Sequence, residues 1–230
     1  MGTVDGVNRP DAGGQDPAGA AALVRSCWDG LILRQGKDGA AAAAELEALV
    51  GNYRGLRRHY HTLDHIAALL MLLDRHIEPA NDRDMLILAI LYHDVVYDPT
   101  RQDNEEASAV WAAGRLKGLG FPPDLVGKVV RCILASRHSH EEPATDDADI
   151  GLLLDLDLSI LAASPDTYRS YALAVRREYA HVPDALYRAG RKRVLESFLA
   201  RDRIYRSAKL RALWEQAARA NLADETARLA

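Results

Sequence analysis

The sequence predicts an all-α fold, and three observations support this prediction. From about Pro17 onward, apolar residues recur three and four positions apart, which is the spacing of helices buried on one face. Residues that cap helix N-termini stand just before several of these segments. No segment shows the strict apolar–polar alternation of a strand, and none contains a convincing hairpin turn.

The predicted helices follow one another along almost the whole chain. The first covers residues 20–33, where Leu23, Cys27 and Leu31 share one face. Further helical segments of similar pattern are predicted at 39–50, 62–77, 83–97, 103–118, 123–138, 147–162, 165–180, 184–200 and 207–224.

Helix starts are marked by capping residues. Asp82, Asp103 and Ser164 precede three of the predicted helices, in positions where a side-chain oxygen accepts a free backbone N–H. Pro165 follows Ser164 at the first helical position, where its missing N–H costs nothing. These signals place the boundaries of the segments.

The chain is predicted to form one domain with a short tail. Residues 1–17 contain glycine, alanine and proline but almost no large apolar side chains, so we expect a flexible N-terminal tail. Residues 18–230 are expected to form a single domain. Of the 230 residues, 48% are hydrophobic, which is enough for one sizeable core.

Charge and cysteine content narrow the function classes. The net charge is −4 and the pI about 6.1, so the chain has no general attraction to a nucleic acid polymer or an anionic membrane. Cys27 and Cys132 lie far apart in apolar context and are expected to be reduced core thiols. No apolar run is long enough for a membrane span, and no secretion signal opens the chain. A cytoplasmic protein with a small-molecule ligand is therefore expected.

Histidines are concentrated in one region of the chain. Five of the eight lie between residues 59 and 93: His59, His61, His65, His76 and His93. On a helix, His61 and His65 would share a face, because they are four residues apart. In the predicted helix 83–97, His93 and Asp94 fall among apolar helical neighbours.

Two aspartates lie on apolar helix faces, where their negative charge must be compensated by another group. Asp94 follows Ile90 and Leu91, and Asp157 has Leu153 behind it and Ile160 ahead. A buried carboxylate costs several kcal/mol unless a cation or hydrogen-bond donors compensate it. A metal ion held by imidazole and carboxylate groups is the favoured compensator. The alternative for Asp157 is a hydrogen bond to a neighbouring helix.

The carboxylate at Asp155 has a less apolar environment than Asp157. Gly151, Leu158 and Ser159 are its helical neighbours, so Asp157 is the better ligand candidate. Asp155 is expected to orient a ligand or to cap a helix.

Several of these residues, in their order along the chain, resemble a known signature. His65, the adjacent His93–Asp94 pair and the distant Asp157 resemble the HD superfamily of metal-dependent phosphohydrolases. A family of predicted phosphohydrolases within it is similar from about Ala20 to Leu222. The similar stretches are YHTLDHI, YHDVVYDPTRQDNEEASA, ILASRHSH, DLDLSILA, VRREY, GRKRVLESFL and IYRSAKL.

The resemblance implies an HD-domain helical bundle with a metal centre. Its ligands would be His65, His93, Asp94 and Asp157, and its metal a divalent Mn, Fe, Co, Zn or Ni ion. The implied reaction is hydrolysis of a small phosphate ester, such as a nucleotide, by a water molecule that the metal activates.

Two stretches are also similar to the cyclic-nucleotide phosphodiesterases of the same superfamily. Their Tyr-His-Asn-x-x-His motif is similar to YHTLDH, with Thr62 in place of the asparagine, and their Ala-Asp-Leu-Ser to LDLS. Carried over, His61 is the general acid. Asp94 would also bridge to a second, weakly held Mg²⁺ or Mn²⁺. Glu105 and Asp98 would orient His61 or a water molecule on the metal.

Cationic residues near these motifs are candidates for binding the phosphate. Arg137, His138 and Arg191 are expected to contact the substrate anion. The alternative for the GRKRV stretch around Arg191 is a solvated helix face. His138 and His140 are the only histidines between Asp94 and Asp157, so one tightly held metal is favoured over two.

Two other functions are compatible with the same signature. The first is an HD-type di-iron oxygenase, but such proteins use more histidines between the HD pair and the final aspartate. The second is a non-catalytic module that binds a nucleotide, although binding alone does not require a general acid at His61. The sequence leaves the substrate, the metal and the presence of a homo-oligomer open.

Overall fold

The computed structural model describes residues 17–78, 80–137 and 145–229. These residues contain no strand, which confirms the all-α prediction. The predicted tail lies outside the described residues except for Pro17, which begins the first helix. The elements are α1 (Pro17–Arg34), α2 (Gly39–Asn52), α3 (Leu63–His76), α4 (Arg83–Tyr92), α5 (Asn104–Gly118), α6 (Pro123–Ala135), α7 (Ala148–Asp157), the 3-10 turn η1 (Leu158–Ala162), α8 (Pro165–Glu178), α9 (Asp184–Leu199) and α10 (Ala208–Arg228).

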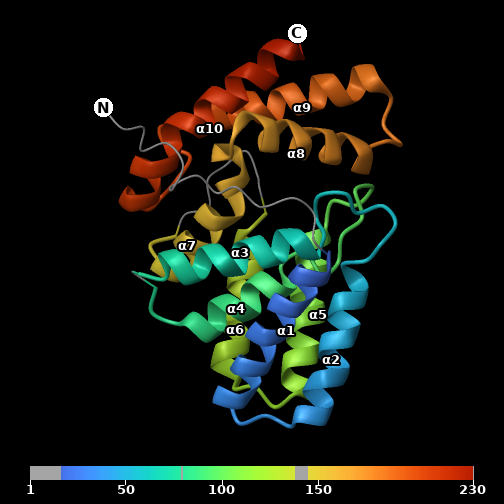
Figure 1. The fold of residues 1–230 in the computed structure, drawn as a ribbon, viewed down its shortest axis with the longest axis vertical. Coiled ribbons are helices and arrows are strands. Elements are labelled where there is room, and N and C mark those ends of the chain that lie inside the picture. Colours follow the sequence, from blue (N-terminus) through green and yellow to red (C-terminus); the bar gives the residue numbers. More distant parts are fainter. Residues whose placement is uncertain (1–16, 79, 138–144, 230) are drawn as a thin grey trace.

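The helices form two groups along the long axis of the molecule. Figure 1 shows α1, α2, α4, α5 and α6 at one end, α3 running across them, and α8, α9 and α10 together at the other end. The element η1 joins the two groups, because it follows α7 directly and packs against α8 and α10. The C-terminal end of α7 therefore lies at the junction of the two groups.

Helix α4 forms the centre of the larger group. Every residue from Met85 to Tyr92 is buried, and α1, α3, α5, α6 and α7 all pack against it. A helix that is apolar on all sides is typical of such a central position. Trp28 is fully buried nearby, with its ring tilted against that of Tyr92.

Most of the predicted caps are present. Asp82 accepts a hydrogen bond from the N–H of Met85, and Ser164 accepts one from the N–H of Thr167. Such a cap typically stabilises a helix by about 1 kcal/mol. Asp103 occupies the cap position of α5 but makes no capping hydrogen bond, because its carboxylate is bound by the Arg101 guanidinium.

One helix ends earlier than the apolar pattern predicts. The sequence predicts a helix over 83–97, whereas α4 ends at Tyr92 and the chain turns at the HD pair. The β-branched Val95 and Val96 disfavour a helix. In addition, the Arg58 guanidinium donates hydrogen bonds to the carbonyl oxygens of Asp94 and Val95. His93 and Asp94 therefore stand at the end of a helix, not within it.

Two further features concern membrane-spanning helices and the cysteines. No helix of the described residues combines the length and the apolar character that a bilayer crossing demands. Cys27 and Cys132 are free cysteines, as predicted, with Cys132 buried in the core and Cys27 partly buried.

Candidate functional site

Arg58 holds together two backbone segments that are distant in the sequence. Its Nη1 donates to the carbonyl oxygens of His61 (2.9 Å) and Asp94 (2.8 Å), and its Nη2 to that of Val95 (3.0 Å). Its guanidinium also lies 5.3 Å from the ring centroid of Tyr97. Only 9% of Arg58 is exposed. This clamp fixes the chain before α3 against the turn after α4.

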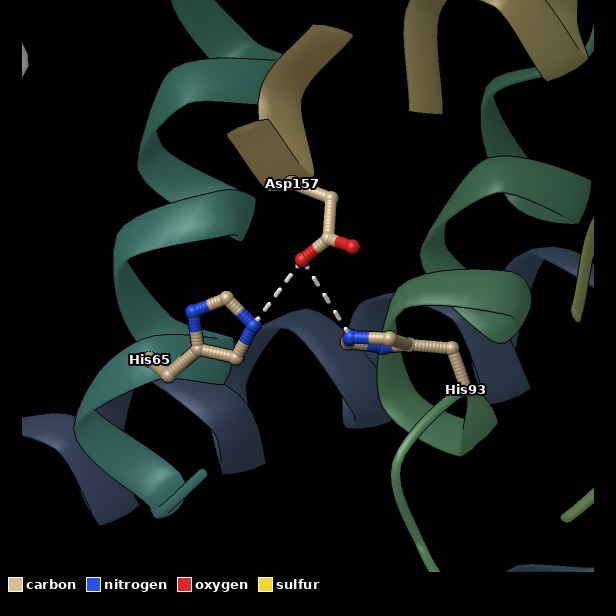
Figure 2. Close-up of side chains that lie close together, drawn as sticks. All are labelled: His65, His93 and Asp157. Atoms are coloured by element: carbon tan, nitrogen blue, oxygen red, sulfur yellow. Dashed lines mark ion pairs between the residues drawn. The ribbon is translucent and has the colours of Figure 1, made fainter. Parts of the chain in front are cut away.

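Three potential metal ligands meet at this junction. His65 comes from the first turn of α3, His93 follows the last residue of α4, and Asp157 ends α7. Asp157 Oδ1 lies 3.2 Å from His65 Nε2 and 3.6 Å from His93 Nε2, and the carboxylate points between the two rings (Figure 2). One ligand atom from each residue lies within 4.8 Å of the other two.

The hydrogen bonding of the two histidines fits a bound metal ion. His65 Nε2 and His93 Nε2 are buried and make no hydrogen bond within the described residues. An unsatisfied buried polar atom costs about 1–3 kcal/mol. The Nδ1 of His93 lies 2.9 Å from the carbonyl of Ile90, which can only accept, so Nδ1 carries the proton and Nε2 keeps its lone pair for a metal. Two imidazoles and a carboxylate suit a divalent Mn, Fe, Co, Zn or Ni ion.

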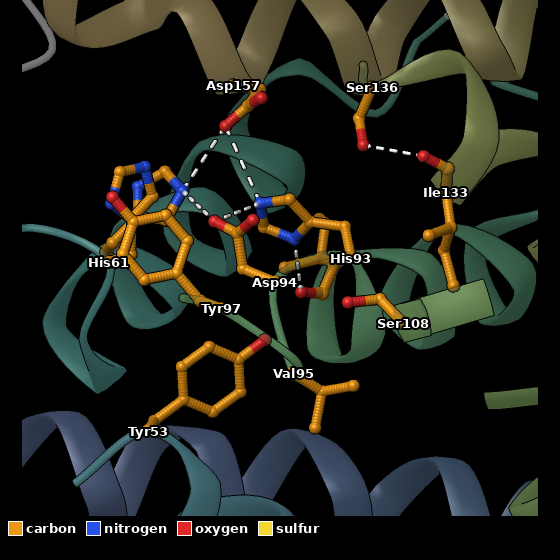
Figure 3. A network of polar contacts seen from close by, with 12 residues as sticks. Tyr53, His61, His93, Asp94, Val95, Tyr97, Ser108, Ile133, Ser136 and Asp157 are labelled. Atoms are coloured by element: carbon orange, nitrogen blue, oxygen red, sulfur yellow. Dashed lines mark hydrogen bonds and ion pairs between the residues drawn. The ribbon is translucent and has the colours of Figure 1, made fainter. Parts of the chain in front are cut away.

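Asp94 lies at the edge of this group. Its Oδ2 is 3.2 Å from His93 Nε2 and 4.0 Å from His65 Nε2 (Figure 3). Burial opposes ionisation of Asp94, but the positive charges that His93 and His61 carry when protonated outweigh burial and lower its pKa. A cation at the centre would compensate both Asp94 and Asp157, and Asp94 can reach it from the side of His93.

His61 lies next to the potential ligands and is oriented by Glu178. Helix α3 begins at Leu63, so His61 precedes the helix. The prediction that His61 and His65 share a helical face is therefore wrong. Their ring centroids are nevertheless 6.2 Å apart. Glu178 Oε2 accepts a hydrogen bond from His61 Nδ1 at 2.7 Å and another from the Tyr97 hydroxyl at 2.8 Å.

The same carboxylate also holds the backbone that carries His61. Glu178 Oε1 accepts hydrogen bonds from the N–H groups of His59, Tyr60 and His61. Burial raises the pKa of Glu178, but the hydrogen bond and the charge of His61 outweigh it and lower the pKa to about 2. Glu178 is therefore a carboxylate that accepts every one of these hydrogen bonds. Nε2 is then the His61 atom left to exchange a proton.

Neighbouring charges favour the protonated form of His61. Burial lowers its pKa, but the carboxylates of Asp94 and Glu178 together outweigh burial and raise the pKa above its usual value. The ring of Tyr97 stacks on His61 with 4.2 Å between centroids, which fixes the imidazole plane.

A cavity of about 690 Å³ opens over the potential metal ligands. His61, His93, Asp94 and Asp157 line it. Residues of α8, α9 and α10 line it as well. The cavity therefore lies where the two groups of helices meet, and its volume is in the range typical of small-molecule sites.

The structure separates the two acidic residues that were predicted to orient His61. Glu105 lines the cavity, but Asp98 is not among its lining residues. The Asp98 carboxylate accepts hydrogen bonds from the N–H and the hydroxyl of Thr100, which forms a turn. The contact with His61 is made by Glu178, from another helix. Orientation of a water molecule on the metal, the other role predicted for Glu105 and Asp98, stays a prediction.

The predicted substrate-binding arginines both line the cavity, each with an acidic partner. Arg137 pairs with Glu106, and Arg191 forms two hydrogen bonds, of 2.8 and 3.0 Å, with Glu225. Arg191 is largely buried, so the alternative of a solvated helix face is wrong for this residue. His138, like His140, lies outside the described residues.

The DLDLS motif divides its two carboxylates as predicted. Asp157 joins the two histidines, whereas Asp155 accepts hydrogen bonds from the N–H of Arg206 (2.7 Å) and of Ser207 (2.8 Å). Ser207 is the N-cap residue of α10. Asp155 therefore fixes the start of the last helix, and only 1% of it is exposed.

Two important residues were missed by the sequence reasoning. Glu178 lies in the VRREY stretch that carries part of the family resemblance, yet its neighbours make it look like one more charged residue of a polar helix. Arg58 belongs to a run of basic residues before the histidines. The signal for Arg58 is its position directly before the YHTLDH motif, and the signal for Glu178 is its place in the VRREY stretch.

Comparison with known proteins gives one match. The family model described as HD domain matches residues 58–177, which is more than half of the chain. The matched range begins at Arg58 and includes all the potential metal ligands, but it ends one residue before Glu178. No curated protein and no solved structure matched the chain.

Proposed function

Since the chain belongs to the HD domain family, we propose that it is a metal-dependent phosphohydrolase that hydrolyses a small phosphate ester. One observation carries the proposal. The unbonded Nε2 atoms of His65 and His93 converge with the Asp157 carboxylate, and His93 and Asp157 line a ligand-sized cavity. His61 lines the same cavity with one nitrogen available for proton transfer.

The metal ligands in this proposal are His65, His93, Asp94 and Asp157. A divalent ion bound there supplies an acidified water and polarises the phosphoryl oxygen. The ligands come from three separate elements that are packed around the buried α4, so their positions are set before any ligand binds. Asp94 is also the residue that we assign to a second, weakly held Mg²⁺ or Mn²⁺.

His61 is assigned as the general acid. Its Nε2 gives a proton to the oxygen of the departing alcohol, while the Nδ1 proton stays in the hydrogen bond to Glu178. Glu178 is a positioning residue, because it holds both the ring and the backbone of His61. Arg58 keeps His61 next to Asp94 by binding both carbonyl groups.

The phosphate group is assigned to the cationic wall of the cavity. Arg137 and Arg191, the phosphate contacts that the sequence predicts, line the cavity, and so do Arg101 and Arg193. Guanidinium groups bind phosphate through paired N–H donors. His138 remains a predicted contact.

The test is release of inorganic phosphate from a panel of nucleotides and sugar phosphates. Protein is loaded separately with Mn²⁺, Co²⁺, Mg²⁺ or Fe²⁺ under reducing conditions, and metal content is measured on the same samples. We expect release by the native protein and none by Asp94→Ala. His181→Ala is the matched control, since His181 is exposed and does not line the cavity. Silence of every metal-loaded sample would contradict the proposal.

A further inference from the structure

The opening of the cavity is marked by lining residues that are also exposed to solvent. Leu186 and Val194 of α9 line the cavity although 66% and 39% of their surface is exposed. Arg193, next to Val194, lines it and is exposed too. By contrast, the side chains of His93 and Asp157 are only 2% and 10% exposed. The potential metal ligands therefore lie inside the cavity, and α9 borders its opening.

Helical spacing explains why Arg193 lies at the edge of the α9 wall. Leu186, Gly190 and Arg193 follow one another at intervals of four and three residues, so they share one face. Arg191 and Leu195, four residues apart, share a neighbouring face that is far less exposed. Arg191 is therefore the inner arginine of α9, and Arg193 is the outer one.

The guanidinium of Arg193 folds back along its own helix. Its Nη2 atom lies 4.0 Å from the position that a Cβ atom would take on Gly190, and Gly190 itself lines the cavity. No other atom of the described residues outside the adjoining backbone comes within 4 Å of that position. The Arg193 guanidinium therefore borders open space at the wall of the cavity.

Arg193 also differs from the other lining arginines in its partners. Three of the four that line the cavity among the described residues are already paired with a carboxylate. The pairs are Arg101–Asp103, Arg137–Glu106 and Arg191–Glu225. Arg193 forms no ion pair and no hydrogen bond within the part of the chain that the structure describes. An anion that binds Arg193 therefore displaces no existing pair.

The opening carries positive charge from both groups of helices, although the net charge of the chain is −4. Arg101 and Arg137, which are both exposed, line the cavity from the larger group. Arg137 Nη2 donates to the carbonyl of Gln102 at 3.2 Å, so these two arginines lie near each other. The lining carboxylates of the described residues, none of them classed as exposed, are Asp94, Glu105 and Asp157. Guanidinium groups at an opening attract anionic groups of a ligand.

We propose that the alcohol part of the substrate carries a second anionic group, a carboxylate or a phosphate, which binds Arg193 at the opening of the cavity. The position of the other phosphate, at the metal ligands, rests on the proposed function. Guanidinium binds either anion through paired N–H donors. A neutral alcohol would fill the same cavity but would gain nothing from the unpaired charge of Arg193.

The experiment measures binding of alkylphosphonates, whose carbon–phosphorus bond is not hydrolysed. Each compound carries a carboxylate, a second phosphonate or a neutral carboxamide at the far end of an alkyl chain of two to six methylene groups. The Mn²⁺-loaded protein, freed of excess metal, is titrated with each compound by calorimetry. At one chain length or more, we expect an anionic end to bind about tenfold tighter than the carboxamide. The tighter of the two anionic ends identifies the second group.

The variant Arg193→Gln isolates the charge. It removes no hydrogen bond from the described structure and changes an exposed side chain, so the variant should fold as well as the native protein. We expect it to lose the gain from either anionic end and to keep the affinity for the carboxamides. Arg203→Gln is the matched control, because Arg203 is exposed and does not line the cavity. This control should keep the gain.

The outcomes separate this inference from the proposed function. Carboxamide phosphonates that bind, without a gain from an anionic end at any chain length, would reject the inference and leave the phosphohydrolase standing. A gain that survives in Arg193→Gln would overturn the role of Arg193. An equal loss in Arg193→Gln and Arg203→Gln would reduce the effect to net charge and would overturn the site. Failure of every phosphonate to bind would contradict phosphate binding at the metal, on which both proposals depend.

Discussion

The Glu178 carboxylate and the His61 imidazole form a hydrogen bond of 2.7 Å although 117 residues separate them in the sequence. The bond joins the end of α8 to the segment before α3, and therefore joins the two groups of helices beside the potential metal ligands. Glu178 also binds the N–H groups of three consecutive residues there. The position of His61 thus depends on a helix that is distant in sequence.

Removing the charge of Glu178 should impair catalysis through His61. Glu178→Gln is expected to lower kcat for esters of poor leaving groups by about tenfold to a hundredfold, because the general acid loses its orientation and part of its basicity. The basic limb of the kcat/KM profile should move to lower pH, since the carboxylate raises the pKa of His61. The measurement is a pH–rate profile with an alkyl phosphate.

A leaving group that needs no proton provides the control for this prediction. With 4-nitrophenyl phosphate, the loss in Glu178→Gln should be much smaller. Tyr97→Phe removes the other side-chain hydrogen bond to Glu178 but keeps the carboxylate, so its profile should shift little. An equal loss for both leaving groups would argue against a role for Glu178 in proton transfer.

The low pKa of Glu178 also predicts how stability responds to acid. Its folded-state pKa is about 2, below the ordinary value of 4.5, so its stabilising effect is complete above about pH 4.5 and is lost as the pH falls towards 2. The free energy of unfolding, measured with urea at each pH, should fall less steeply across this range in Glu178→Gln. Glu196→Gln, an exposed change on α9, should follow the native curve.

The two carboxylates of the DLDLS motif should give opposite results. Asp157→Ala should weaken Mn²⁺ binding by about a hundredfold or more, because it removes a ligand. Asp155→Ala should keep the metal but lower the free energy of unfolding by about 2 kcal/mol, because two N–H groups at the start of α10 lose their acceptor. Metal titration and urea unfolding of both variants measure the two effects.

Thermal unfolding with and without metal provides a second test of the difference between Asp155→Ala and Asp157→Ala. A ligand at about a hundred times its Kd stabilises a protein by about 2.7 kcal/mol. The melting temperature of Asp155→Ala should therefore rise on addition of Mn²⁺ as in the native protein. A rise of the same size in Asp157→Ala would exclude Asp157 as a ligand.

Arg58 should be essential for the junction that carries the site. Arg58→Met removes hydrogen bonds to three carbonyl groups and is expected to cost about 3 kcal/mol of stability. It should also weaken metal binding, because His93 and Asp94 lose the support of their turn. Arg57→Met is the matched control: Arg57 is exposed, so its loss should change stability by less than about 0.5 kcal/mol. Similar urea midpoints for the two variants would contradict the role of Arg58.

Much of this protein follows from local pattern. The helices are predictable because apolar residues at helical spacing must be buried and because Asp82 and Ser164 provide caps within their own segments. His93 and Asp157 are predictable because a carboxylate or an imidazole on an apolar face requires a partner, whereas His65 is assigned through the resemblance to the HD signature. The amino-acid sequence by itself therefore determines the all-α class and the potential ligands.

Only the tertiary structure decided which residues position His61 and the turn that carries His93 and Asp94. Glu178, not Glu105 or Asp98, orients His61, and Arg58 ends α4 at Tyr92 by binding carbonyl groups beyond it. The physical reason is the same in each case. A polar side chain on a polar segment has no periodic signature, and its role is set by the distant atoms that the fold brings within hydrogen-bonding range.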